Sequence, residues 1–217
     1  WIIENYDIDG TGMGFCIYFG NTTDYFVVND CYLHGASANS NEYYWNAGIT
    51  LYNVQNGVVI GNNVSSNVGF GVFLYTNCLN NSVNGNYITN NYDGIYIFTN
   101  SNGNTVSDNT VLFNTNNGIL IESSSGNIIT SNIIDDCAYG FYVLAGTSCV
   151  LAENFVSNAY MGLWMTDFSC GNTIIDNTFF NNYYGMQLLH TINNTIFHNN
   201  FANNTIHQNV YETNINI

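Results

Sequence analysis

The amino-acid sequence predicts an all-β chain that folds as a single right-handed parallel β-helix, a solenoid of about nine stacked rungs of 22 to 25 residues each. Three observations predict this fold. An asparagine and a glycine recur in step along the 217 residues, apolar residues alternate with polar ones around both, and proline is absent. Proline would remove hydrogen bonds from β-ladders, so its absence suits a chain made almost entirely of strands and tight turns.

The recurrent residues define the rungs. The asparagine recurs after 33, 24, 23, 23, 22, 23 and 22 residues, at Asn29, Asn62, Asn86, Asn109, Asn132, Asn154, Asn177 and Asn199. The glycine stands at Gly14, Gly48, Gly69, Gly94, Gly118, Gly140, Gly162 and Gly185. Both series have a long first interval, so we expect an insertion near residues 34–45. Equivalent residues of parallel rungs stack about 4.8 Å apart, where asparagine amides hydrogen-bond as a ladder.

Four columns of apolar residues run alongside these markers. Three residues before the asparagine the column starts at Phe26, and two residues after it at Cys31. One residue after the glycine the column starts at Phe15 and includes Phe70, and three after it the column starts at Ile17. A spacing of two residues is the period of a strand and not of a helix. Because one rung cannot bury its apolar face alone, we expect the rungs to stack and share a continuous core.

The charge balance excludes several classes of function. The chain has 15 acidic residues, no lysine and no arginine, and a formal net charge of −15. Without cationic side chains it cannot neutralise phosphates, so we predict no nucleic-acid binding and no attachment to anionic membranes. No apolar run approaches the roughly 20 residues that span a bilayer, so no membrane insertion is expected. Because the chain starts at Trp1 rather than at methionine, we expect a piece of a longer precursor.

The repeated pattern resembles a known family. Stretches such as GNYITNNYDGIYIFTNSNGNTVSDN (85–109) and GNTIIDNTFFNNYYGMQLL (171–189) closely resemble the parallel β-helix repeat family, and within it the NosD-like repeats. The resemblance covers essentially the whole chain. It implies the solenoid fold and a secreted or surface protein of the kind common in methanogenic archaea. It specifies function poorly, because this solenoid carries lyases, hydrolases, adhesins and structural proteins.

The residues present disfavour the catalysis and the copper chemistry that this resemblance implies. Pectate-lyase-like members use an arginine or lysine as base, and this chain has neither. Asp135 and Asp136 look like the paired acids of polygalacturonase-like members, yet they occupy a turn that asparagines fill in other rungs. NosD itself is linked to copper-site maturation, but we interpret His190, His198 and His207 as ordinary surface and turn residues. The prediction is a protein that is not an enzyme.

Residues in register suggest one weak metal site, one disulfide and several modification sites. Glu153 and Asp176 stand one rung apart, where a bridging calcium ion would relieve their repulsion; solvent screening accounts for the pair equally well. No other cofactor is expected. Cys149 and Cys170 lie in neighbouring turns and are candidates for a disulfide. Five N-x-S/T sequons are glycosylation candidates: Asn21, Asn63, Asn80, Asn193 and Asn203.

The outward face of one predicted sheet is apolar. Its expected interface or glycan-stacking residues are Tyr18, Tyr52, Phe73, Tyr96, Phe98, Tyr142 and Trp164. A contiguous apolar patch marks an interface, or is covered by a neighbouring domain of the same precursor. No lysine, proline or capping helix blocks pairing at the solenoid ends.

These features favour a non-catalytic extracellular or cell-surface structural protein that self-assembles into a filament, sheath or surface layer, with further copies of itself as partners. The alternative is a carbohydrate-binding surface adhesin, in which Tyr96, Tyr142 and Trp164 stack on the sugar rings of cell-surface glycans. A polysaccharide-active enzyme is the third and least favoured class, because the cationic residues are missing.

Overall fold

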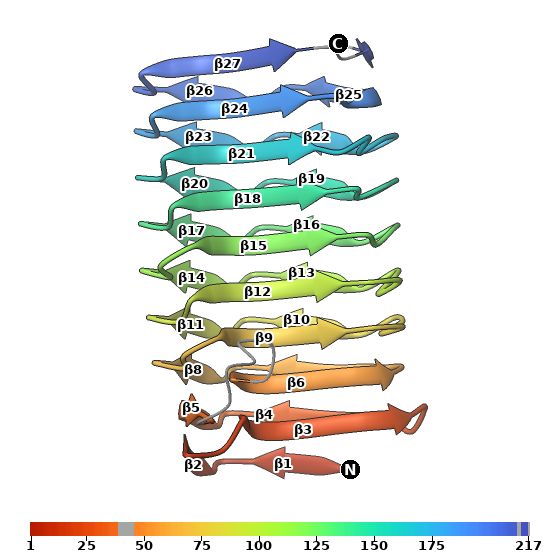
Figure 1. Ribbon diagram of the computed structural model, residues 1–217, viewed down its shortest axis with the longest axis vertical. Helices are drawn as coiled ribbons and strands as arrows, with labels where there is room; N and C mark the ends of the chain where they lie inside the picture. Colours follow the sequence, from red (N-terminus) through yellow and green to blue (C-terminus); the bar gives the residue numbers. More distant parts are fainter. Residues whose placement is uncertain (39–45, 212–213, 217) are drawn as a thin grey trace.

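The chain forms a solenoid whose rungs rise from the N-terminus to the C-terminus (Figure 1). A computed structural model describes residues 1–38, 46–211 and 214–216, and every regular element in these ranges is a β-strand. The strands form three parallel sheets, to each of which a complete rung contributes one strand. The predicted all-β parallel β-helix of about nine turns is therefore confirmed.

The three sheets run along the whole solenoid. Sheet A consists of β1 (Ile2–Glu4), β4 (Phe26–Asn29), β7 (Gly57–Ile60), β10 (Ser82–Asn84), β13 (Thr105–Ser107), β16 (Ile128–Thr130), β19 (Val150–Ala152), β22 (Thr173–Ile175), β25 (Ile192–Phe197) and β28 (Asn214–Asn216). Sheet B consists of β2 (Asp7–Thr11), β5 (Tyr32–Ser37), β8 (Asn63–Ser65), β11 (Tyr87–Thr89), β14 (Thr110–Leu112), β17 (Ile133–Asp135), β20 (Phe155–Ser157), β23 (Thr178–Phe180) and β26 (Asn200–Ala202). Sheet C consists of β3 (Phe15–Thr22), β6 (Ala47–Val54), β9 (Phe70–Tyr75), β12 (Asp93–Phe98), β15 (Asn117–Glu122), β18 (Tyr139–Leu144), β21 (Met161–Thr166), β24 (Tyr184–Leu189) and β27 (Ile206–Tyr211).

The interior is one apolar cluster shared by all rungs. In sheet A, Val106 lies opposite Val83 and Ile129, and all three side chains are fully buried. The cluster extends from Ile17 to Ile196 through side chains of all three sheets. Because each rung supplies only a few of these side chains, every rung depends on its neighbours for burial.

Stacked asparagines close the corners between strands. The predicted ladder is formed by Asn62, Asn86, Asn109, Asn132, Asn154, Asn177 and Asn199. Asn109 Nδ2 donates to Asn132 Oδ1 and to the Val83 carbonyl, while its Oδ1 accepts from the backbone N and the Nδ2 of Asn86, all at 2.9 Å. These corners interrupt the strand pairing, so the amides satisfy backbone groups that would otherwise be buried without partners.

Two further ladders occupy the other corners of the rungs. One contains Asn81, Asn104, Asn127, Asn172 and Asn194, with Cys149 in place of asparagine in one rung. The Cys149 N–H donates to Asn172 Oδ1 at 2.8 Å, so the ladder continues through the substituted rung. The other was not predicted from the sequence and forms two runs, one of Asn67, Asn91 and Asn114 and one of Asn182 and Asn204.

The predicted alignment of the first complete rung is wrong by two residues. Asn29 does not begin the ladder, because it lies opposite Ile60, and the Cys31 N–H is the group that donates to Asn62 Oδ1, at 3.0 Å. Val28 therefore occupies the sheet A core column in which Phe26 was expected, although Phe26 is also buried. A shift by two residues keeps inward and outward positions unchanged, so apolar alternation could not reveal the error.

The glycine column faces the core at the start of sheet C. A Cβ atom on Gly118 would lie 2.4 Å from Ile134 Cγ2 and 2.8 Å from the Gly140 carbonyl oxygen, so close packing explains this glycine. In β9 the matching residue is Gly71, which packs against the next glycine, and not Gly69 as predicted. Phe70 consequently lies outside the core, in an outer aromatic cluster of sheet C.

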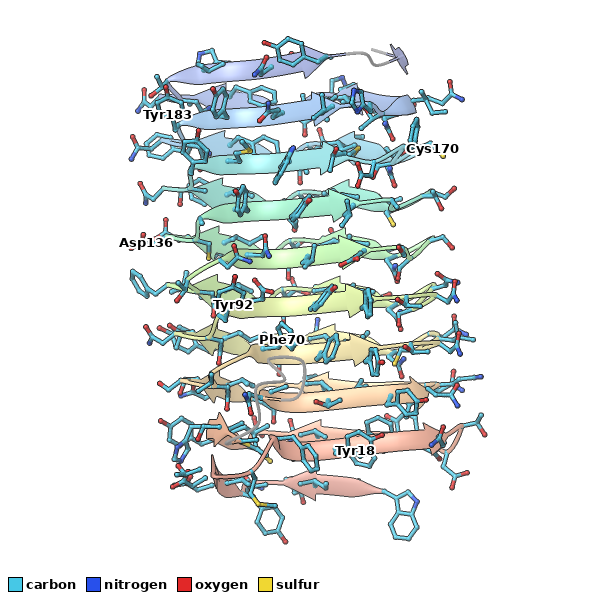
Figure 2. The ribbon with its side chains drawn as sticks, viewed as in Figure 1. Tyr18, Phe70, Tyr92, Asp136, Cys170 and Tyr183 are labelled. Atoms are coloured by element: carbon cyan, nitrogen blue, oxygen red, sulfur yellow. The ribbon has the colours of Figure 1, made fainter. Side chains whose placement is uncertain are left out.

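The insertion and the disulfide differ from expectation. β5 extends to Ser37 and pairs His34 with Ser65, so the first residues of the predicted insertion belong to sheet B. Residues 39–45 lie outside the described ranges. The predicted Cys149–Cys170 disulfide is absent, since both thiols are free. Cys149 is buried in the core, whereas Cys170 pairs with Thr147 in a half-exposed outer turn (Figure 2).

Candidate functional site

The outer face of sheet C carries stacked aromatic side chains, as the sequence predicted. Parallel register places Phe73 over Tyr96, with ring centroids 5.1 Å apart and planes inclined by 21°. Tyr142 lies on Trp164 with centroids 4.5 Å apart and planes inclined by 6°. Rings on successive rungs stack because the rung spacing is close to the separation preferred by offset aromatic pairs.

The exposure of this face is uneven. Phe73 and Tyr96 lie outside the interior core, yet they are only 1% and 5% exposed. They form an outer cluster with Phe70, Ala47 and Leu120, in which each ring covers its neighbours. The other predicted residues of this face are exposed or half-buried: Tyr18, Tyr52, Phe98, Tyr142 and Trp164.

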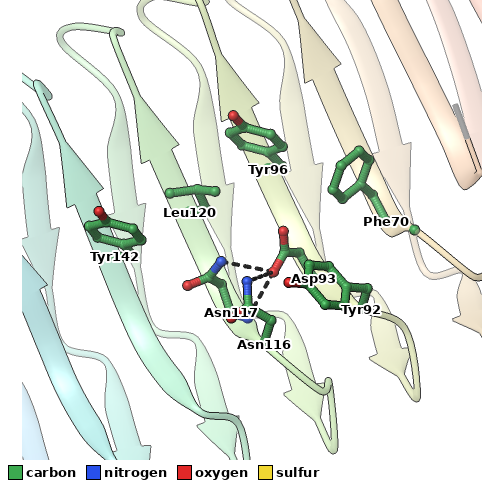
Figure 3. A pocket seen from close by; sticks show the side chains of 9 residues that line it. Phe70, Tyr92, Asp93, Tyr96, Asn116, Asn117, Leu120 and Tyr142 are labelled. Atoms are coloured by element: carbon green, nitrogen blue, oxygen red, sulfur yellow. Dashed lines mark hydrogen bonds between the residues drawn. The ribbon is translucent and has the colours of Figure 1, made fainter. Parts of the chain in front are cut away.

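A pocket of about 440 Å³ opens on this face over β9, β12, β15 and β18 (Figure 3). Its apolar walls are formed by Phe70, Tyr92, Tyr96, Leu120 and Tyr142. Its polar part is formed by Asp93, Asn116 and Asn117. Aromatic walls with a few convergent polar groups, at a volume within the usual range for small-molecule sites, identify it as the candidate binding site.

Asp93 is the central polar residue of the pocket, and it is only 3% exposed. Its Oδ1 accepts three hydrogen bonds, from Asn117 N at 2.8 Å, Asn117 Nδ2 at 2.8 Å and Asn116 Nδ2 at 3.0 Å. Burial raises the pKa of the Asp93 carboxyl, and these hydrogen bonds oppose the rise. Its Oδ2 points away from the two asparagines, toward Tyr96 and Phe70 (Figure 3).

Sequence analysis did not find Asp93. The residue directly before the core-facing glycine is Phe70, Asn117, Tyr139, Met161 or Tyr184 in the other well-aligned rungs, and Asp93 alone is acidic in this series. An acidic residue in a column of otherwise aromatic, apolar or amide side chains was the feature of the sequence that could have pointed to Asp93. The misassigned glycine of β9 put Val68 in place of Phe70 in this column, which still left Asp93 as the acidic exception.

The two candidate calcium ligands lie in a turn column. Glu153 and Asp176 have left-handed backbones with φ of 57° and 55°, and they stack with Ser131 and His198. Ser131 Oγ donates to Glu153 Oε2 at 3.3 Å, and His198 Nδ1 lies 3.7 Å from Asp176 Oδ1. The pair is exposed, and calcium binding between its carboxylates stays a prediction.

The five sequon asparagines all lie at the surface. Four of them have left-handed backbones with φ between 53° and 57°, namely Asn21, Asn80, Asn193 and Asn203. Asn63 is an exposed residue at the start of β8. Their exposure is what an acceptor for glycosylation requires, and their modification stays a prediction.

Fold and site together define a parallel β-helix protein with a candidate ligand pocket on the outer face of one sheet. The family model described as periplasmic copper-binding protein (NosD) matches residues 2–117 and 36–217. These matches span nearly the whole chain, so it belongs to the NosD family. The search of curated proteins found no match.

Solved structures share the fold at low sequence identity. The mannuronan C-5 epimerase AlgE4 A-module of Azotobacter vinelandii has a TM-score of 0.81 at 13% identity, over 100% of this chain and 63% of its own. The tailspike protein 2 enzymatically active domain of bacteriophage CBA120 has 0.71 at 12% identity, over 86% and 32%. The DFA-IIIase of Arthrobacter chlorophenolicus A6 has 0.69 at 15% identity, over 88% and 50%. The chain thus spans between 32% and 63% of the length of these structures.

The described residues do not fit a resident copper site. Copper prefers thiolate, thioether and imidazole ligands, and within the described part of the chain no three His, Cys, Asp or Glu side chains are grouped to hold a metal. Met165 is fully buried in the core. Burial raises the pKa of the Cys137 thiol to about 12, which disfavours the thiolate that a metal would need.

Proposed function

We propose that this protein is an exported, non-catalytic carbohydrate-binding protein whose pocket on sheet C holds a saccharide unit. The observation that carries the proposal is the pocket itself, where aromatic walls flank a buried carboxylate and two amides. Aromatic side chains supply the flat apolar surface that sugar rings stack on, and Asp93 and Asn117 supply acceptors for hydroxyl groups. The periplasmic description of the family supports export.

Two observations support binding without turnover. The residues that line the pocket include a single carboxylate, Asp93, whereas glycoside hydrolysis uses a pair. The chain has no lysine or arginine to act as a base or to clamp an anion. One of the proteins with a similar fold is a mannuronan C-5 epimerase, which supports a carbohydrate as the class of ligand.

A glycan array probed with the full chain tests the proposal. We expect binding to a restricted set of glycans, and a loss of about tenfold in affinity on Tyr142→Ala, because its ring lines the pocket. Tyr87→Ala is the matched control, since Tyr87 is an exposed tyrosine of sheet B. Absence of binding to any glycan, or equal effects of the two substitutions, would overturn the proposal.

A second candidate is the self-assembling structural protein. Among the described strands, β1, β2 and β3 each pair on one side only, and such edges template pairing with another chain. Sheet B also exposes Ile133 and Phe155 on adjacent rungs. Electron microscopy and sedimentation at rising protein concentration test this candidate. Ordered polymers would support it, and monomers at all concentrations would exclude it.

A further inference from the structure

The pocket contains a carboxyl group that has no cationic partner in the protein. Asp93 is almost completely buried, and the chain has no lysine or arginine that could pair with it. Buried carboxylates normally have a cationic partner or a full set of hydrogen-bond donors. All three donors that reach Asp93 bond to Oδ1, so Oδ2 has no partner among the described residues.

A second acceptor in the pocket lining is also unused. Asn117 Oδ1 is buried and has no hydrogen-bond partner within the described part of the chain. Its amide nitrogen already donates to Asp93, which fixes the orientation of the side chain. Because Asn117 Oδ1 is covered, Asp93 Oδ2 is the unpaired acceptor of the pocket that a ligand would use, and it fits a ligand group that only donates. An ammonium group has three donors and no acceptor.

The aromatic walls of the pocket also suit an ammonium group. Phe70, Tyr92 and Tyr96 lie around the carboxylate, and Tyr142 lies farther off, beyond Asn117 and Leu120 (Figure 3). Phe70 and Tyr96 meet edge to face, with centroids 5.3 Å apart and planes inclined by 67°, so they form two sides of a corner. The Tyr96 hydroxyl donates to Glu122, so it does not draw on the Asp93 carboxylate. Aromatic rings around an anion stabilise a cation through ring quadrupole and charge together.

The geometry points to the protonated amino group of an amino sugar as the group that the Asp93 pocket selects. This inference rests on the proposed carbohydrate binding and narrows its substrate class. A uronate would place a second carboxylate beside Asp93 in a protein of net charge −15, with no cation to separate them. A neutral sugar would leave the Asp93 charge uncompensated. A sugar bearing an ammonium group would donate to Asp93 Oδ2 and compensate the charge.

The test compares three tetrasaccharides that share a β-1,4 backbone. Isothermal titration of the full chain uses the tetramers of glucosamine, N-acetylglucosamine and glucose at mildly acidic pH, where the sugar amine is protonated. We expect the glucosamine tetramer to bind at least about tenfold more tightly than either neutral tetramer. Asp93→Asn should abolish this preference, because it should weaken binding of the glucosamine tetramer far more than binding of the neutral tetramers. Glu153→Gln removes one exposed charge away from the pocket and should preserve the preference.

The outcomes separate this inference from the proposed function. If the three tetramers bind equally and Asp93→Asn changes nothing, carbohydrate binding stands and the amino-sugar inference is wrong. If no tetramer binds, the inference is wrong, and the glycan array then decides the proposed function. If Asp93→Asn fails to fold, Tyr92→Ala replaces it, because Tyr92 is an exposed wall residue. It should weaken binding of the glucosamine tetramer several-fold and of the glucose tetramer less, and equal weakening would contradict the inference.

Discussion

Replacing Asn109 by alanine removes one complete unit of the ladder between sheets A and B. The side chain is 1% exposed and takes part in four hydrogen bonds, each of 2.9 Å. Two go to Asn86, one to Asn132 and one to the Val83 carbonyl. At a net value of about 1 kcal/mol for each buried bond, the free energy of unfolding should fall by about 4 kcal/mol.

Urea unfolding followed by circular dichroism measures this loss. Asn63→Ala is the matched control, because Asn63 is exposed and its side chain has no hydrogen-bond partner among the described residues. A surface substitution of this kind should change the free energy of unfolding by about 0.5 kcal/mol or less. If the two variants differ by less than about 1 kcal/mol, the ladder does not contribute the stability that its geometry implies.

Three further predictions concern backbone packing, thiols and pH. Gly118→Ala should lower the free energy of unfolding by several kcal/mol, because the added Cβ has no room. Gly126→Asn should be nearly neutral, because that site is open and its backbone is left-handed. Similar urea midpoints for the two variants would contradict this prediction. In alkylation followed by mass spectrometry, half-exposed Cys170 should react in the folded protein. Cys137, whose burial raises its thiol pKa to about 12, should react only after unfolding. Equal alkylation rates would contradict the protection of Cys137 by burial. The pKa of the Asp93 carboxyl is higher in the folded state than its unfolded value of about 3.8. The contribution of Asp93 to the free energy of unfolding is therefore complete at pH values below the unfolded pKa, and it is lost as the pH rises through the folded pKa. Asp93→Asn should therefore stabilise the protein more at neutral than at acidic pH, and a pH-independent difference would exclude this role.

Most of the fold could be predicted because one rung determines the next. Asn86 to Asn199 recur with spacings that leave a single parallel register, and the structure reproduces that register without a shift over these rungs. The predicted alignment of the earlier rungs was wrong for a physical reason. Asn29 and Gly69 lie two residues from the true ladder and glycine positions, and a two-residue error preserves the inward and outward pattern.

The site was less predictable than the fold. The aromatic face was expected from Tyr142 and Trp164, which do stack. The burial of Phe73 and Tyr96 was not expected, because it depends on how rings of several rungs pack together. Asp93 escaped notice because its importance comes from Asn116 and Asn117, one rung away, and not from any motif around it.

The ladder has a consequence for how the gene can change. Each ladder asparagine receives from the rung before and donates to the rung after through the same atoms, over steps of 22 to 24 residues. Duplicating or deleting one whole rung therefore joins surfaces that already fit each other. Tandem duplication and unequal recombination can lengthen or shorten this protein in single-rung steps without designing a new interface. The Asp93 pocket lacks this freedom, because its walls come from four successive rungs and an insertion within them would separate Phe70 from Tyr142.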